Sequence, residues 1–129
     1  MEKGRITSIS DFQLLQNVWE KQVLCDEQLS PQGRFDRMME EVDEAKEELT
    51  HLNGTEASRQ RLGAEIADVI FVALGVLSTL NISAEDELNR ILDQNYRKYN
   101  PIVNKELRAN GMNHDQALAH QKRIWTRPK

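Results

Sequence analysis

The sequence predicts an all-α fold, a four-helix bundle with an additional C-terminal helical segment. Proline occurs only at positions 31, 101 and 128 of the 129 residues, which leaves two long blocks without a helix breaker. Apolar residues in these blocks recur at helical spacing, and no alternating run of β-branched residues indicates a strand. Because no repeat, low-complexity tract or linker divides the chain, we expect one domain over residues 1–129, with a core at about 10–101 and an extension at 102–129.

The first two helices are expected at about residues 10–22 and 34–52. Ser8 or Ser10 can cap the first helix, and its apolar residues then share one face. The second helix carries an apolar stripe and ends before Gly54, because glycine readily adopts the left-handed conformation that follows a helix end.

The third helix is expected to begin near Thr55 or Ser58 and to run to about residue 80. From Ile66 onward it is apolar on almost every side, which places it at the centre of a bundle or in a subunit interface. Its longest apolar stretch, Val69 to Leu77, is too short to cross a bilayer.

Two further helices complete the expected fold. The fourth begins after Ser83 and runs to Tyr99, where Asn100 and Pro101 end it. One weaker helix is expected in the remainder, at about residues 115–124.

Charge and cysteine content restrict the class of protein. The chain has 17 basic and 21 acidic residues, a net charge of −4, which argues against general electrostatic binding to nucleic acid. The single cysteine, Cys25, cannot form an internal disulfide. The first residues contain no apolar segment of the secretory type, so we expect a cytoplasmic protein without a membrane partner.

The acidic residues of the second helix fall on different faces of a helical wheel. Glu40 and Glu47 lie opposite the apolar stripe and belong to a solvated face. Glu41 and Glu44 lie on another side, and Glu41 borders the apolar stripe. This second set is expected to be partly inward.

The third helix carries a second acidic pair, Glu65 and Asp68, which share a face because they are three residues apart. Burying ionised carboxylates without a positive partner costs more than a small domain tolerates. A salt-bridge network with Arg59 and Arg61 is one solution. The short loop between the two helices, however, predicts an antiparallel hairpin in which both acidic pairs come level. Four carboxylates without a nitrogen or sulphur ligand favour Mg²⁺ or Mn²⁺ and hence phosphate chemistry.

The motifs Glu41-x-x-Glu44 and Glu65-x-x-Asp68, with twenty residues between them, resemble those of the MazG-type, all-α nucleoside triphosphate pyrophosphatases. The segment Asn-Tyr-Arg-Lys-Tyr at 95–99 resembles the Asn-x-x-Lys/Arg-Tyr signature of the same family. The resemblance covers roughly residues 10 to 101 and leaves out the C-terminal tail.

The resemblance implies hydrolysis of a (d)NTP to the monophosphate and pyrophosphate, as a nucleotide-pool house-cleaning enzyme. It also implies that Mg²⁺, with Mn²⁺ as a possible substitute, is held by Glu41, Glu44, Glu65 and Asp68, which are then both the metal ligands and the catalytic carboxylates. Either Glu41 or Glu44 is expected to take the proton from the attacking water. Related proteins pack as dimers or dimers of dimers, so a homodimer or homotetramer is expected.

Four other residues are candidates for substrate binding. Lys98 offers positive charge and Asn95 a hydrogen bond to the phosphates, although polar residues near a helix end are also favourable without any ligand. Phe12 or Trp19 can stack on the base, and packing in the core is the alternative role for both.

Two other interpretations remain open. A non-enzymatic helical bundle would use its acidic faces to bind a partner and its apolar third helix to oligomerise. A di-iron carboxylate bundle would need Glu-x-x-His pairs, whereas Glu44 and Asp68 occupy the corresponding positions.

Overall fold

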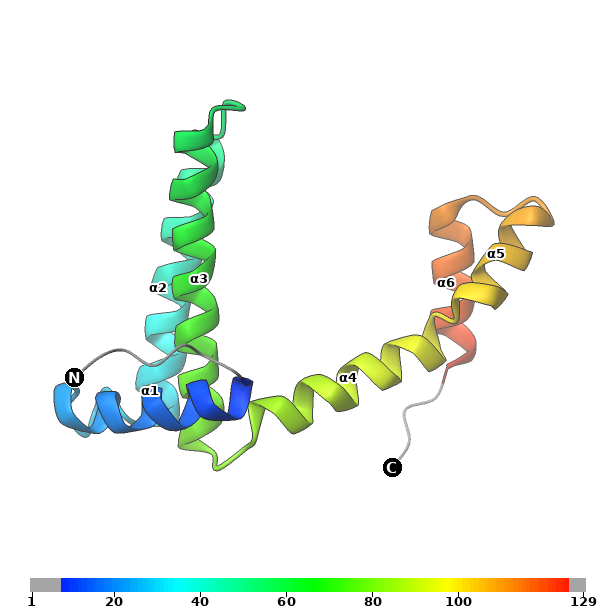
Figure 1. Cartoon of the computed structure of the whole chain (residues 1–129). Helices are drawn as coiled ribbons and strands as arrows, with labels where there is room; N and C mark the ends of the chain where they lie inside the picture. The colour runs from blue at the N-terminus through cyan, green and yellow to red at the C-terminus, as the bar shows by residue number, and fades with distance from the viewer. Residues whose placement is uncertain (1–7, 126–129) are drawn as a thin grey trace. The chain divides into compact units, whose positions relative to one another are not determined.

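The computed structural model describes residues 8–125 and confirms the all-α class. Its two compact units comprise residues 1–85 and 86–129. The described part contains no strand and six helices (Figure 1): α1 (Ile9–Val23), α2 (Pro31–Thr50), α3 (Glu56–Thr79), α4 (Ala84–Lys98), α5 (Pro101–Ala109) and α6 (His114–Ile124).

Each of the first three helices begins at a hydroxyl cap. The side chains of Ser8, Ser30 and Thr55 accept hydrogen bonds from the backbone N–H three residues later, at 3.0, 3.0 and 3.2 Å. α2 begins three residues before the predicted start, because Ser30 caps it and Pro31 fits the first turn, where a missing N–H costs nothing. Gly54 follows α2 with φ +83°, a left-handed conformation that suits the turn into α3.

The predicted hairpin of the second and third helices is confirmed, since α2 and α3 lie side by side along their length (Figure 1). α1 packs against α3 and is tied to the end of that helix by Gln13. Its side-chain amide donates to Ser78 Oγ at 3.0 Å and to the Ile82 carbonyl at 2.9 Å, and its oxygen accepts from the Ala84 N–H at 2.9 Å. These bonds fix α1 relative to the hairpin.

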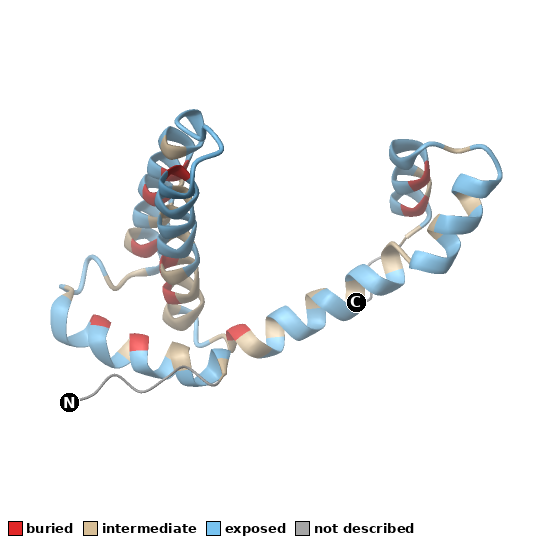
Figure 2. Cartoon of the chain, turned by 45° about the horizontal axis from the view of Figure 1, so that its top comes forward, coloured by how far each residue is buried: buried red, intermediate tan, exposed pale blue. Residues whose placement is uncertain are grey.

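Few residues of α3 are fully buried in the single chain, and its N-terminal half is mostly exposed (Figure 2). Ile66 and Ile70 are exposed, as is Leu80 directly after the helix, and only 11% of the most apolar window of the helix is buried. Taken over its 24 residues, rather than over the shorter apolar stretch considered above, α3 is long and apolar enough to span a membrane by length and composition alone. A helix that is covered by another protein chain has the same composition.

The second unit contains one helix that the sequence interpretation missed. The predicted helix at 115–124 is confirmed as α6, which begins with a capping box between Asn113 and Gln116. α5 was not predicted. Asn100 and Pro101 were interpreted as the end of a helix, but Asn100 Oδ1 also accepts the Ile102 N–H at 2.9 Å and so begins the next one. Most of α4 belongs to the second unit, whereas α1, α2 and α3 belong to the first. The packing of α4 against these three helices in a four-helix bundle therefore stays a prediction.

Candidate metal centre

The α2–α3 hairpin brings three of the four predicted carboxylates together. One carboxylate oxygen each from Glu41, Glu44 and Glu65 lies within 4.8 Å of the other two. Glu41 is only 4% exposed, Glu65 is half-buried and Glu44 is exposed. The cluster therefore has a buried inner side and a solvent-facing side, and its members come from both helices of the hairpin.

Asp68 lies near this cluster without joining the three converging oxygens. Its negative charge contributes to the raised pKa values of both Glu41 and Glu65. Its side chain is exposed and lines the same cavity as Glu41. The structure thus places Asp68 at the edge of the cluster.

Burial and the mutual repulsion of the carboxylates raise the pKa values of two members of the cluster. Burial raises the pKa of Glu41, and a hydrogen bond and repulsion from Glu44 raise it further, while Arg37 acts in the opposite direction. Loss of hydration raises the pKa of Glu65, and the charges of Glu44 and Asp68 add to the effect. A bound cation would relieve this repulsion.

The arginines proposed as an internal solution are paired elsewhere. Arg59 binds Glu56 at 3.1 Å, and Arg61 binds Glu48 at 3.3 Å. Neither forms an ion pair with a carboxylate of the cluster. The salt-bridge network that Arg59 and Arg61 would have formed around Glu65 is therefore not present among the described residues.

Within the described part of the chain, two buried oxygens of the cluster have no hydrogen-bond partner, Oε2 of Glu41 and Oε2 of Glu65. Buried polar atoms are nearly always satisfied in folded proteins, so an orphaned pair in one place needs a reason. Carboxylate oxygens are the ligands that Mg²⁺ prefers, and the cluster contains no histidine or cysteine. The residues present fit a hard divalent cation.

A cavity of about 410 Å³ adjoins the cluster within the first unit. Glu41 and Asp68 supply carboxylates to its wall, and Arg37 supplies positive charge. Trp19 and Phe71 supply aromatic surface. A cavity with this lining is suited to a ligand that combines an aromatic ring with charged groups.

The two aromatic candidates from α1 have different positions. Phe12 and Trp19 both pack edge-on against Phe71, each with ring centroids 5.7 Å apart. Only Trp19 lines the cavity, and it is 46% exposed. Trp19 is therefore placed to contact a ligand, while Phe12 packs against α3 beyond the cavity lining.

A buried ion pair behind the cavity was missed by the sequence analysis. Arg34 Nε lies 2.9 Å from Glu20 Oε2, and their side chains are only 5% and 4% exposed. Burial raises the pKa of Glu20, and Arg34 partly offsets this. Gln16, on the same face of α1, donates to the Phe71 carbonyl. The helical spacing of Gln16 and Glu20 was the available signal, because two polar residues four apart indicate a polar strip on one face.

Asn95 and Lys98 lie on the part of α4 that belongs to the second unit. Lys98 Nζ sits 5.2 Å from the ring centroid of Tyr99 and 5.3 Å from that of Trp125. Asn95 is exposed. A contact of either residue with substrate stays a prediction.

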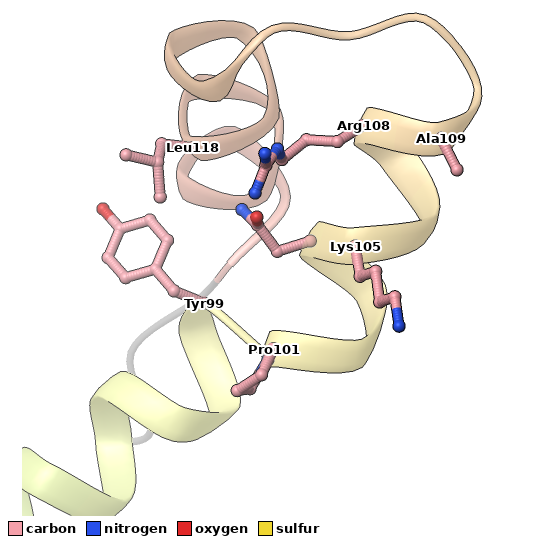
Figure 3. A pocket seen from close by; sticks show the side chains of 7 residues that line it. Tyr99, Pro101, Lys105, Arg108, Ala109 and Leu118 are labelled. Atoms are coloured by element: carbon pink, nitrogen blue, oxygen red, sulfur yellow. The ribbon is translucent and has the colours of Figure 1, made fainter.

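The second unit has a hollow of its own, of about 730 Å³, between α5, α6 and the end of α4 (Figure 3). Arg108 reaches across it toward Leu118, and Lys105 is a second basic residue of its lining. None of the described residues that line this hollow is acidic. Residues 86–129 include nine basic and five acidic side chains, against eight and sixteen in residues 1–85. The two units thus differ in the sign of their charge.

Comparison with known proteins identifies no relative. No family model matches the chain, and no curated protein or solved structure matches it either. The candidate site therefore has to be judged on its own residues.

Proposed function

We propose that this protein is a Mg²⁺-dependent nucleoside triphosphate pyrophosphohydrolase that converts a (d)NTP into the monophosphate and pyrophosphate. One observation carries the proposal: Glu41, Glu44 and Glu65 converge beside a cavity, with buried oxygens that have no partner. The resemblance of the two acidic motifs to the MazG-type family supports the choice of substrate.

In this proposal Glu41, Glu44 and Glu65 hold the metal, with Asp68 at the edge of the site. When bound, the metal would neutralise the triphosphate and orient a water for attack. The oxygen of that water bonds to phosphorus, and the anhydride bond between the α- and β-phosphates breaks. Glu41 or Glu44 takes the proton of the water as the general base.

The rest of the substrate is assigned to the cavity. Trp19 offers its exposed face to the base, and its packing on Phe71 holds the indole in place. Asn95 and Lys98 remain candidates for phosphate contacts. A second copy of the chain is proposed to cover the apolar side of α3. A cytoplasmic role in nucleotide-pool house-cleaning accords with the pyrophosphohydrolase activity.

The test is release of pyrophosphate from a panel of NTPs and dNTPs, with Mg²⁺ and with EDTA. The proposal predicts release that requires the metal and that ranks the bases. Replacement of Mg²⁺ by Mn²⁺ should preserve the reaction, since both prefer oxygen ligands. Release that is equal in EDTA would refute the metal-dependent mechanism.

The alternative function is a non-enzymatic bundle that binds a partner. The basic second unit and the uncovered side of α3 favour it, because both are suited to contacts with another protein. Thermal unfolding in Mg²⁺ and in Na⁺ at equal ionic strength separates the two. A docking bundle gains no more from Mg²⁺ than from Na⁺, whereas a metal site gains specifically from Mg²⁺.

A further inference from the structure

Arg37 stands out because it touches the carboxylate cluster directly. Its Nη2 lies 2.5 Å from Glu41 Oε1, and its Nη1 lies 2.7 Å from Glu40 Oε2. In the described part of the chain, it is the only cationic side chain with an ion pair to Glu41, Glu44, Glu65 or Asp68. The guanidinium lines the cavity and is half-exposed, so it is free to move toward solvent.

The two partners of Arg37 are in different environments. Glu41 is almost fully buried, and its second oxygen has no hydrogen-bond partner among residues 8–125. Glu40 is exposed and lies on the solvated face of α2. The guanidinium therefore already bridges a buried site and a solvent-exposed carboxylate, and it can leave the first while it keeps the second.

We infer that Arg37 is a built-in counter-cation of the carboxylate cluster, which a divalent metal displaces from Glu41 when it binds. This inference rests on the metal site of the proposed function. Without a metal, the guanidinium compensates part of the charge of a buried carboxylate that would otherwise be costly. With a metal present, the two cations compete for the same oxygens, so the guanidinium moves to Glu40 and the cavity wall.

Competition of this kind has an opposite effect on stability and on metal affinity. Removal of the Arg37 charge leaves Glu41 unpaired next to Glu44 and Glu65, so the metal-free protein becomes less stable. The same removal makes the cluster more negative and eliminates the competitor, so the metal binds more tightly. A side chain with a purely structural role would lower stability without raising metal affinity.

The experiment is calorimetric titration of Mn²⁺ into the full chain without nucleotide, for the wild type and for Arg37→Met. The affinity of the variant should rise by about fivefold or more, the usual range for coupling between two binding events. Its metal-free melting temperature should fall, and the increase that Mn²⁺ produces should be larger than in the wild type. Arg37→Gln keeps a donor for Glu41 without the charge and replaces the methionine variant if that one does not fold.

Arg59→Met is the matched control, because Arg59 also pairs with a glutamate on its own helix but lies away from the cluster. Its Mn²⁺ affinity should equal that of the wild type. An unchanged or weaker affinity in the Arg37 variants, with the wild type binding Mn²⁺, would overturn this inference and leave the proposed function standing. No binding of Mn²⁺ to the wild type would overturn both.

Discussion

Substitution of Gly75 tests the packing of the buried side chains next to the cavity most directly. It lies in α3 against the buried pair of Glu20 and Arg34. A methyl group added there would lie 2.7 Å from Arg34 Nη2, 2.8 Å from Glu20 Oε1 and 2.9 Å from Arg34 Nε. All three distances are shorter than real contacts of a Cβ, and the atoms belong to the charged ends of both side chains. The ends of both buried side chains therefore have to shift in Gly75→Ala, which disturbs their ion pair.

The size of the effect follows from two opposing contributions. Breaking a buried ion pair costs about 3–5 kcal/mol, because at least one charge is left buried without its partner. Replacing glycine by alanine in a helix interior returns about 1 kcal/mol. Gly75→Ala is therefore expected to lower the free energy of unfolding, by about 2–4 kcal/mol where the ion pair is lost completely and by less where the two side chains shift together.

Gly63 provides the matched control in the same helix. A methyl group added there meets no atom within 4 Å, so Gly63→Ala should gain the helix contribution of about 1 kcal/mol. Urea unfolding followed by helical circular dichroism measures both variants against the wild type. Equal stability of the two variants would refute the assignment of Gly75 as the contact that the buried pair requires.

Further outcomes concern the site itself. Glu65→Gln and Asp68→Asn should each abolish pyrophosphate release and keep the helical circular dichroism spectrum. Without metal, both variants should melt no lower than the wild type, because one repelling charge is gone. Full activity in either variant would contradict the assignment of the site. Glu47→Gln removes a solvent-exposed carboxylate whose contact with His51, 3.2 Å away, is also exposed, so steady-state kinetics should detect little change. A large loss would mean that the outer face of α2 is part of the site. Trp19→Ala should raise KM for the nucleotide, and an unchanged KM would exclude Trp19 from the base pocket. The metal-free protein should lose stability as pH rises from about 4.5, the ordinary pKa of a glutamate, through the raised pKa values of Glu20, Glu41 and Glu65. In that range the folded state binds more protons than the unfolded state. Melting in EDTA across pH tests the sign, and a rise in stability over that range would contradict it.

The convergence of Glu41, Glu44 and Glu65 was predictable because it depends on few quantities. Helical periodicity places residues three apart on one face, and a short loop fixes how two helices align in a hairpin. Those two constraints bring the acidic pairs level whatever the surrounding side chains are. The caps Ser8 and Thr55 follow from equally local chemistry.

Features that depend on contacts across helices were not predictable in the same way. The pair of Glu20 and Arg34 joins α1 to α2, and neither partner indicates the other in the sequence. Arg37 was overlooked because a charged residue on the outer part of a helix ordinarily belongs to the solvated face. α5 was missed because Asn100 and Pro101 suit both the end of one helix and the beginning of the next.

We propose that the carboxylate cluster supports cleavage of a triphosphate between its α- and β-phosphates. The most direct measurement quantifies pyrophosphate and nucleoside monophosphate together, from wild-type protein and from Glu65→Gln, with Mg²⁺ and with EDTA. We expect equal amounts of the two products from the wild type with Mg²⁺. Neither product should rise above background in the wild type with EDTA, or in the variant with Mg²⁺ or with EDTA. Orthophosphate and nucleoside diphosphate as the products, or equal turnover by Glu65→Gln, would contradict this reaction.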